Sequence, residues 1–323
     1  MKPTPSPAPE FSALVREATA KEHAAEVAAL RLELDHTRQT LEQLKAARSA
    51  RVPKAAGQRT RTKGDTVRVI VPDTHGCKAD KRAIAAFLAD LKTLDPHEII
   101  FLGDHVDCGG FLAQHHVMGY VAETDYSYED DLAAANALLD AVQKTAPRAT
   151  IDYIEGNHER RVETWCVTQT LRSAKDSERL RQLYAPEFRL DLAARGIAYH
   201  RQGVFAEGLS VPGVIKRGKC FFFHGISTAR NAVGATLDRI GGNSVSGHTH
   251  RAQSEITRTV GAGVVGAWNP GCLCEMQPLW QHTVPTKWTH GYAVQLVAPS
   301  GEFLHLNIPI IDGKTHFTAL FKL

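Results

Sequence analysis

The chain has no long hydrophobic run and no strong excess of charge of either sign. Its longest apolar stretches, such as residues 264–268, are far shorter than the ~18 consecutive residues that a membrane-spanning helix needs. Residues 1–7 also lack the apolar core of a secretory signal, so we expect a cytoplasmic protein rather than an integral membrane or secreted one. Of the 323 residues, 43% are hydrophobic, which excludes a chain that is disordered throughout and allows one large globular domain or two ordinary ones.

Cysteine is scarce, and no two of the six cysteines form a Cys-x₂-Cys pair. This pattern does not indicate a zinc finger or a zinc ribbon. In a reducing cytoplasm the thiols would not form a disulfide framework either. We expect core or loop positions for Cys77, Cys108, Cys166, Cys220, Cys272 and Cys274.

Basic residues are concentrated in the N-terminal part of the chain. Residues 1–65 hold 12 Lys and Arg against 8 Asp and Glu, while the remainder is almost neutral. Residues 1–10 contain four prolines and are expected to be a disordered tail. Residues 11–50 contain no Gly or Pro and are rich in helix-forming residues, so we expect a helix there. Residues 51–65 are expected to be a flexible basic linker.

Two features of this N-terminal part indicate partners. Apolar side chains recur at heptad positions, which is typical of a short coiled coil. Residues 20–48 would therefore mediate homo-oligomerisation, or the helix would pack on the chain's own body. The positive charge of the linker would bind nucleic-acid phosphates or would only be solvated. The heptad seam consists of Val27, Leu30, Leu34, Leu41 and Leu44.

From residue 66 to residue 323 the pattern changes to short β-branched runs that alternate with amphipathic segments. This alternation is typical of an α/β domain. Between residues 163 and 195 we expect an inserted helical segment. We predict helices at residues 79–92 and 128–145, and strands at residues 67–71, 98–102, 150–154, 219–223 and 244–246.

Each of the five predicted strands ends at residues that commonly bind metals. Carboxylate and imidazole groups suit hard to borderline divalent cations, and the carboxyl ends of strands are where open α/β sheets place their sites. Turn capping would explain a single residue of this kind. It does not explain the whole set, in which such residues follow all five strands. In chain order the strand ends contain Asp73 and His75, Asp104 and Asp107, Asn157 and His158, His224, and His248 and His250.

The number of these side chains indicates two metal ions. A single tetrahedral zinc ion needs only about four ligands, whereas two ions that share a bridging carboxylate would use all the candidates. Two Asp, one Asn and four His suit manganese, which we take as the first choice, and also iron, zinc, nickel or a mixed pair. The candidate ligands are Asp73, His75, Asp104, Asn157, His224, His248 and His250.

Together these strand ends resemble the five sequence blocks of the calcineurin-like metallophosphoesterase superfamily, which are D-x-H, GDxxD, GNH[DE], H and GHxH. All five blocks are present in order between residues 67 and 309. The resemblance does not extend to residues 1–65 and is weak in the insert. It implies an α/β sandwich of two β-sheets flanked by helices, and it implies hydrolysis of a phosphate ester.

The resemblance also implies roles in catalysis. A water or hydroxide held between two cations ~3.5–4 Å apart would attack phosphorus in line. His158 would donate a proton to the leaving oxygen, and Asp107 would orient His158 or else cap a turn. In the metal site, Asp104 matches the bridging ligand, Asp73, His75 and His250 match the ligands of one ion, and Asn157, His224 and His248 match those of the other.

The superfamily resemblance leaves the substrate open. Its Ser/Thr protein phosphatases have arginines where this chain has Cys108 and Glu155, and a thiol and a carboxylate cannot replace two guanidinium groups. We therefore predict that the substrate is a phosphodiester or a nucleotide, with a nuclease acting on DNA or RNA as the alternative. A non-catalytic coiled-coil scaffold with a structural metal site is a third hypothesis. Arg160 and Arg161, which follow the third block, would contact phosphate or lie in solvent.

Overall fold

The computed structural model describes the part of the chain that carries these motifs. The described residues are 27, 28, 31, 35, 65–109, 111, 127–170, 173–201, 213–277 and 285–317. The chain divides into two units, Met1–Val52 and Pro53–Leu323. In the first unit the described residues, which are Val27, Ala28, Arg31 and Asp35, are helical and exposed. The expected tail, coiled coil and basic linker, with their expected partners, otherwise lie outside the described residues.

A six-stranded sheet in the second unit is formed, in order, by β11 (Phe303–Pro309), β10 (Gly291–Val297), β1 (Thr66–Val71), β2 (Glu98–Phe101), β3 (Thr150–Ile154) and β4 (Ala198–His200). Strands β1 to β4 are parallel, whereas β10 pairs with β1 in the antiparallel direction. Because β1, β2 and β3 run the same way, their carboxyl ends lie at one edge of the sheet.

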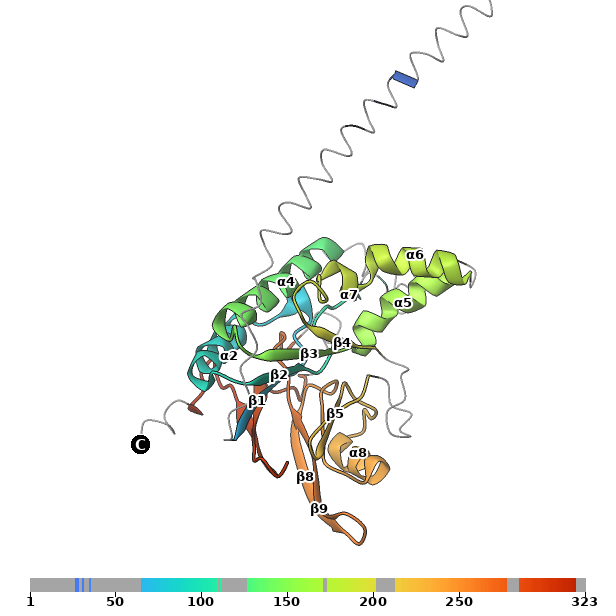
Figure 1. Cartoon of the computed structure of the whole chain (residues 1–323). Helices are drawn as coiled ribbons and strands as arrows, with labels where there is room; N and C mark the ends of the chain where they lie inside the picture. The colour runs from blue at the N-terminus through green and yellow to red at the C-terminus, as the bar shows by residue number, and fades with distance from the viewer. Residues whose placement is uncertain are drawn as a thin grey trace, which may run out of the picture. The chain divides into compact units, whose positions relative to one another are not determined.

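A five-stranded sheet is formed, in order, by β5 (Ile215–Arg217), β6 (Cys220–Phe223), β7 (Ser244–Ser246), β9 (Gly263–Pro270) and β8 (Ala252–Thr259). Strands β6, β7 and β9 are parallel, and β8 and β9 form an antiparallel hairpin that extends downward in Figure 1. The carboxyl ends of β6 and β7 therefore also lie at one edge of their sheet.

Alternating side chains of the first sheet pack on its two faces. Ile70 is fully buried and packs with Phe222 and Val245 of the second sheet. Its neighbours Val69 and Val71 belong instead to the core on the helical side of the sheet. Because successive side chains of a strand point to opposite faces, each buried apolar run contributes side chains both to the helical side and to the second sheet. The two sheets consequently form a sandwich with an apolar core between them.

Helices cover the outer faces of this sandwich (Figure 1). Helices α2 (Lys81–Leu94) and α4 (Tyr128–Thr145) pack on the first sheet through their apolar side chains. Helix α8 (Ala232–Ile240) packs on β9 through Val233 and Leu237. None of the described helices is long and apolar enough to cross a bilayer. The predicted fold class, two β-sheets flanked by helices, is confirmed.

The region of the expected insert is helical where it is described. It contains the second half of α5 (Asn157–Gln169), then α6 (Ala174–Tyr184) and α7 (Pro186–Arg189). Helix α5 begins within the third sequence block, at a residue predicted to bind metal. The insert is therefore joined to the predicted site by one helix and does not form a separate unit.

Local sequence explains where α2 begins. The carboxylate of Asp80 accepts hydrogen bonds from the main-chain N–H groups of Arg82 and Ala83, so Asp80 is the N-cap and the helix starts at Lys81. The prediction placed this start two residues earlier. A short 3₁₀ helix, η1 (Gly76–Lys78), occupies the space between the first motif and α2. The predicted bounds agree with the structure for α4, β3 and β7.

Asp152 of β3 links the two sheets. Its carboxylate accepts hydrogen bonds from Nη2 of Arg217 on β5 at 2.6 Å and lies 2.7 Å from Nε2 of His200 on β4. Burial raises the pKa of Asp152, but the hydrogen bond with His200 and the charge of Arg217 lower it below its ordinary value of 3.8. The ionised carboxylate is therefore favoured by folding.

We predict that Asp152→Asn lowers the free energy of unfolding at neutral pH by about 1–2 kcal/mol. The figure is moderate because the Arg217 side chain is 38% exposed. Since the folded pKa lies below the unfolded one, the carboxylate's contribution is complete above about pH 4 and is lost as the pH falls through the folded pKa. Urea unfolding of both proteins over this range measures the difference. If the difference in free energy of unfolding between the two proteins does not shrink in acid, the ionised carboxylate of Asp152 does not stabilise the fold as proposed.

Candidate metal centre

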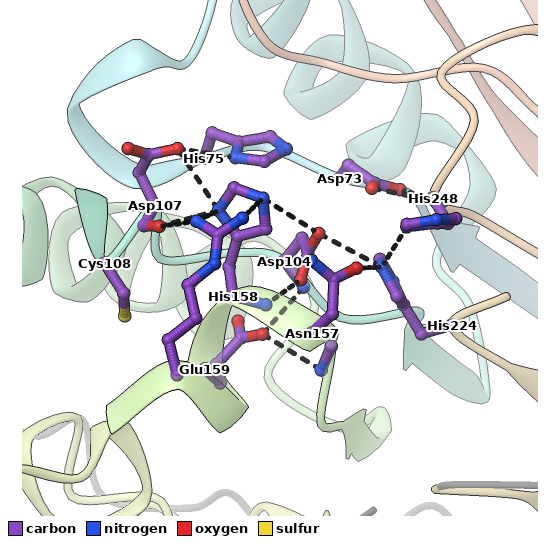
Figure 2. Close-up of polar contacts among 12 residues, drawn as sticks. Asp73, His75, Asp104, Asp107, Cys108, Asn157, His158, Glu159, His224 and His248 are labelled. Atoms are coloured by element: carbon purple, nitrogen blue, oxygen red, sulfur yellow. Dashed lines mark hydrogen bonds and ion pairs between the residues drawn. The ribbon is translucent and has the colours of Figure 1, made fainter. Parts of the chain in front are cut away.

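The predicted ligands lie together where strands of both sheets end, as Figure 2 shows for most of them. The carboxyl ends of parallel strands meet at a common edge, and the face-to-face packing of the sheets brings the two edges together. Strand β1 is followed by Asp73 and His75, β2 by Asp104, β3 by Asn157, β6 by His224, and β7 by His248 and His250.

Four of these residues have left-handed backbone conformations. The φ angle is 52° at His75, 54° at Asp104, 72° at His248 and 57° at His250. Such angles are uncommon for residues other than glycine and cost of order 1–3 kcal/mol each. Strain of this kind persists where the surrounding structure requires it. Its concentration at the strand ends supports a functional site.

One group of potential ligands surrounds His250. The Nε2 atom of His250 lies 3.1 Å from Nε2 of His75 and 3.1 Å from Oδ2 of Asp73. All three residues are buried. Their donor atoms face one another, as ligands directed at a shared cation do. The sequence did not predict that Cys274 would lie here, with its Sγ atom 3.9 Å from Nδ1 of His250.

A second group surrounds His224. Its Nε2 atom lies 2.8 Å from Oδ1 of Asn157, 3.0 Å from Oδ2 of Asp104 and 3.1 Å from Nδ1 of His248. Its Nδ1 atom lies 3.0 Å from the carbonyl oxygen of Leu102. A donor bond to that carbonyl orients the ring so that Nε2 is directed at the other potential ligands.

Asp104 lies between the two groups. Its carboxylate forms one potential ligand set with His75 and His158 and another with His224 and His248. A carboxylate that bridges two ions requires this position. Buried oxygen and nitrogen donors directed at shared points fit divalent cations. All seven predicted ligands are thus brought together, and they form clusters that could hold divalent metal ions.

The carboxylates give this region a negative electrostatic potential. Burial lowers the pKa of His75, but its hydrogen bond to Asp107 and the charges of Asp107 and Asp104 raise it to about 9. At His224 burial acts in the same way, and Asp104 raises the pKa to about 9. Both shifts favour positive charge at the site. Bound cations would supply that charge in place of protons.

Two glycines let the backbone approach the carboxylates closely. A Cβ atom at Gly156 would lie 2.0 Å from Oδ1 of Asp104, and a Cβ atom at Gly247 would lie 2.4 Å from Oδ1 of Asp73. Both distances are far shorter than any real carbon–oxygen contact. A larger residue at either position would therefore displace a predicted ligand, which explains why glycine precedes Asn157 and His248.

Glu159 is a buried carboxylate whose role the sequence did not predict. One oxygen, Oε2, accepts from the main-chain N–H groups of Asp104 and Gly156, both at 2.9 Å. The other, Oε1, accepts from the N–H of His105 at 2.7 Å and from the hydroxyl of Tyr153 at 2.7 Å. The carboxylate thereby ties the loop after β2 to the start of α5. Glu159 is a positioning residue for the predicted ligands.

His158 and Asp107 lie beside the predicted ligands, as the sequence led us to expect. The main-chain N–H of His158 donates to Oδ1 of Asp104 at 2.8 Å. The ring atom Nδ1 of His158 lies 2.6 Å from the carbonyl oxygen of Asp107 and 3.3 Å from its Oδ1. The same Oδ1 lies 2.9 Å from Nδ1 of His75. Asp107 therefore contacts a predicted ligand as well as the predicted acid.

Further residues support the predicted ligands from other parts of the chain. The side-chain amide of Asn269 donates to the carbonyl oxygen of Gly247 at 2.6 Å, which holds the turn that carries His248. The ring of Trp288 meets that of His250 edge to face, with centroids 4.1 Å apart. Neither role could be inferred from spacing, because one depends on the position of strand β9 and the other on the path of a distant loop.

We predict that Glu159→Gln lowers the free energy of unfolding by about 2–3 kcal/mol. Both carboxylate oxygens accept from N–H groups, so an amide NH₂ in either orientation would face donors and leave buried groups unsatisfied. Tyr153→Phe removes a single hydroxyl donor and should cost about 0.5–1.5 kcal/mol. Urea unfolding of both variants without added metal measures the two values. Equal effects would contradict the role given to Glu159.

No family model matches the chain, and no curated protein matches its sequence. Solved structures do align with most of it. A single-residue variant of Vps29 from Entamoeba histolytica is 14% identical, with a TM-score of 0.37, over 77% of this chain and 95% of that one. Vacuolar protein sorting 29 from Cryptosporidium parvum is 13% identical, with a TM-score of 0.37, over 78% and 95%. The phosphoesterase YfcE from E. coli is 15% identical, with a TM-score of 0.32, over 75% and 98%.

The resemblance to a known superfamily rests on the chain's own residues and fold, not on these distant alignments. Five sequence blocks that are far apart in the chain meet where the strands of two packed sheets end. The fold is the sandwich that those blocks implied. In its fold, and in the order and convergence of the five blocks, the chain resembles the calcineurin-like metallophosphoesterases.

Proposed function

We propose that the chain is a dinuclear metal-dependent phosphoesterase. The observation that carries the proposal is the position of Asp104, whose carboxylate lies within reach of the proposed ligand His75 on one side and of His224 and His248 on the other. A structural site would need only one closed set of about four ligands. The presence of His158 beside Asp104, on the side of His75, further supports catalysis over a purely structural role.

The chain's residues would divide the work as follows. Two divalent ions would activate a water molecule for in-line attack on phosphorus and offset the charge on the phosphate oxygens. Asp104 would contact both ions. Asp73, His75 and His250 would hold one ion, and Asn157, His224 and His248 would hold the other.

His158 would protonate the leaving oxygen. Its Nδ1–H donates to the carbonyl oxygen of Asp107 at 2.6 Å, which fixes the ring and leaves Nε2 as the atom that exchanges a proton with the substrate. Asp107 would keep the ring in this orientation through its carbonyl and through its carboxylate, 3.3 Å from Nδ1. The hydrogen bond of Asp107 to His75 would couple this acid to the ion held by His75.

The proposed substrate is a phosphodiester or a nucleotide. Support comes from the two positions at which Ser/Thr protein phosphatases carry arginines, because Cys108 and Glu155 are both buried here. Manganese remains the proposed metal, with iron, zinc or nickel as alternatives. A nuclease activity through residues 51–65, and a scaffold role without catalysis, are outcomes that the experiments below distinguish.

We predict that Asp104→Asn lowers kcat/KM for bis-p-nitrophenyl phosphate with Mn²⁺ by about 100-fold or more. The matched control is Asp95→Asn, because Asp95 is a half-buried helix C-cap residue outside the candidate site, with φ 38°, which asparagine also tolerates. Metal analysis should show fewer than two ions bound to Asp104→Asn and two bound to the control. If Asp104→Asn kept full activity, the proposed function would be wrong.

The same assay compares substrates. Preference for bis-p-nitrophenyl phosphate over p-nitrophenyl phosphate supports a phosphodiesterase, and degradation of single-stranded DNA as well would identify a nuclease. Hydrolysis of nucleotides that spares DNA would identify a small-molecule enzyme. A protein that binds two ions but hydrolyses none of these substrates would favour the scaffold.

We predict that His158→Gln lowers kcat by about 10²–10⁴-fold on esters whose leaving group is a poor one, such as an alkyl alcohol. The loss should be much smaller for p-nitrophenol, because this leaving group departs without protonation. Metal content should be unchanged, since His158 is not one of the proposed ligands. Equal losses on both kinds of ester would show that His158 acts in some other way.

A further inference from the structure

Cys108 and Glu155 stand at the two positions where the Ser/Thr protein phosphatases carry phosphate-binding arginines. In this structure both side chains make other contacts. Cys108 is fully buried and belongs to the core on the helical side of the first sheet. Glu155 is also buried, and its Oε1 atom accepts a hydrogen bond from the hydroxyl of Tyr199 at 2.8 Å. Neither side chain supplies a cation to the site, so a different residue must supply any guanidinium.

Arg161 brings a guanidinium to the site from helix α5. It lies three residues after His158, so both side chains project from the same face of the helix. Its Nη1 atom donates to the carbonyl oxygen of Asp107 at 3.2 Å and lies 2.7 Å from Nδ1 of His158. Its Nη2 atom lies 2.8 Å from Nε2 of His158. The guanidinium is thus held against the residue proposed to protonate the leaving group.

Among the described residues, the acceptors close to this guanidinium are fewer than its donors. Arginine has five N–H donors and no acceptor. A neutral imidazole has one acceptor nitrogen and a protonated one has none, so Arg161 cannot form hydrogen bonds with both ring nitrogens of His158. Because the Nδ1–H of His158 donates to the carbonyl of Asp107, the described residues offer the five donors of Arg161 two acceptors, that carbonyl and Nε2 of His158. N–H groups of Arg161 therefore remain for an anion beside His158. Because Arg161 is half-buried, an anionic oxygen there would form a strong charge-assisted hydrogen bond.

We propose that Arg161 binds a non-bridging oxygen of the substrate phosphate next to His158. This inference rests on the proposed phosphoesterase function. It assigns to a helix residue the contact that the Ser/Thr protein phosphatases make with arginines at the positions of Cys108 and Glu155. In binding the phosphate, the guanidinium moves from the imidazole to the phosphate oxygen, which frees Nε2 of His158 to face the leaving group.

The test compares Arg161→Gln and Arg161→Lys with the control Arg160→Gln. Arg160 is the adjacent residue on α5, and its side chain is exposed. Two readouts are used on the metal-loaded protein. The first is the affinity for inorganic phosphate by calorimetry, and the second is kcat/KM for bis-p-nitrophenyl phosphate.

Arg161→Gln should weaken phosphate binding about 10-fold and lower kcat/KM about 10–100-fold, the effect expected for a lost charge-assisted hydrogen bond. Arg161→Lys should recover part of both losses, because a lysine ammonium keeps the positive charge but lacks the paired N–H donors of the guanidinium. Free guanidinium at millimolar concentration should partly restore Arg161→Gln. Arg160→Gln should match the wild type, and all variants should bind as much metal as the wild type.

Unchanged phosphate affinity in Arg161→Gln would overturn the proposal. Losses of phosphate affinity and kcat/KM in Arg160→Gln as large as those in Arg161→Gln would also overturn it. A structural role would instead appear as a loss of metal or of stability with no rescue by guanidinium. The phosphate titration separates this proposal from the proposed function. If the wild type binds metal and phosphate but hydrolyses no ester, the titration still decides the role of Arg161. If metal-loaded wild type binds no phosphate, the proposal is wrong.

Discussion

The arrangement of the candidate metal centre depends above all on the buried carboxylate of Glu159. It accepts hydrogen bonds from the amides of Asp104 and His105 on one loop and from that of Gly156 at the start of α5. The ends of β2 and β3 are thereby fixed relative to each other, and Asp104 and Asn157 with them. Since every partner is a donor, only an ionised carboxylate satisfies them all.

This carboxylate also carries an electrostatic cost. Burial and the nearby charge of Asp104 raise the pKa of Glu159 to about 7. The site therefore brings several negative groups together in a region of low dielectric, which is unfavourable without positive charge nearby. Divalent cations would offset this cost, so we expect metal binding to stabilise the fold as well as to enable chemistry.

Residues from both sheets contribute to the centre, so the site exists only when the sheets are packed. The apolar contact between Ile70 and Phe222 and the ion pair between Asp152 and Arg217 both join the two layers.

Much of the fold, and the convergence of most candidate ligands, could be predicted from the sequence, because the information is local. A buried strand such as β3 is a short β-branched run, and the predicted ligand Asn157 follows it after two residues. The hairpin of β8 and β9 could not be predicted in this way. Strand β8 is largely exposed on both faces and lacks apolar alternation, and Gly266 interrupts β9.

Strand β11 pairs with its sequence neighbour β10. Strand β10 joins the first sheet by pairing with β1, whose residues lie more than 200 positions away, as Val69 does from Val294. Such pairing leaves no local pattern. The same limitation applies to side chains that act through other residues. Glu159 was visible only as part of a motif, whereas Cys274 and Trp288 approach His250 from loops whose paths depend on tertiary structure.

The central claim is that Asp104 bridges two metal ions. Electron paramagnetic resonance of the protein during a titration with Mn²⁺ tests it most directly, because two manganese ions that share a carboxylate are magnetically coupled. The account predicts that two ions bind per chain and that the spectrum is that of a coupled pair. Binding of a single ion, or of two ions without coupling, would contradict it.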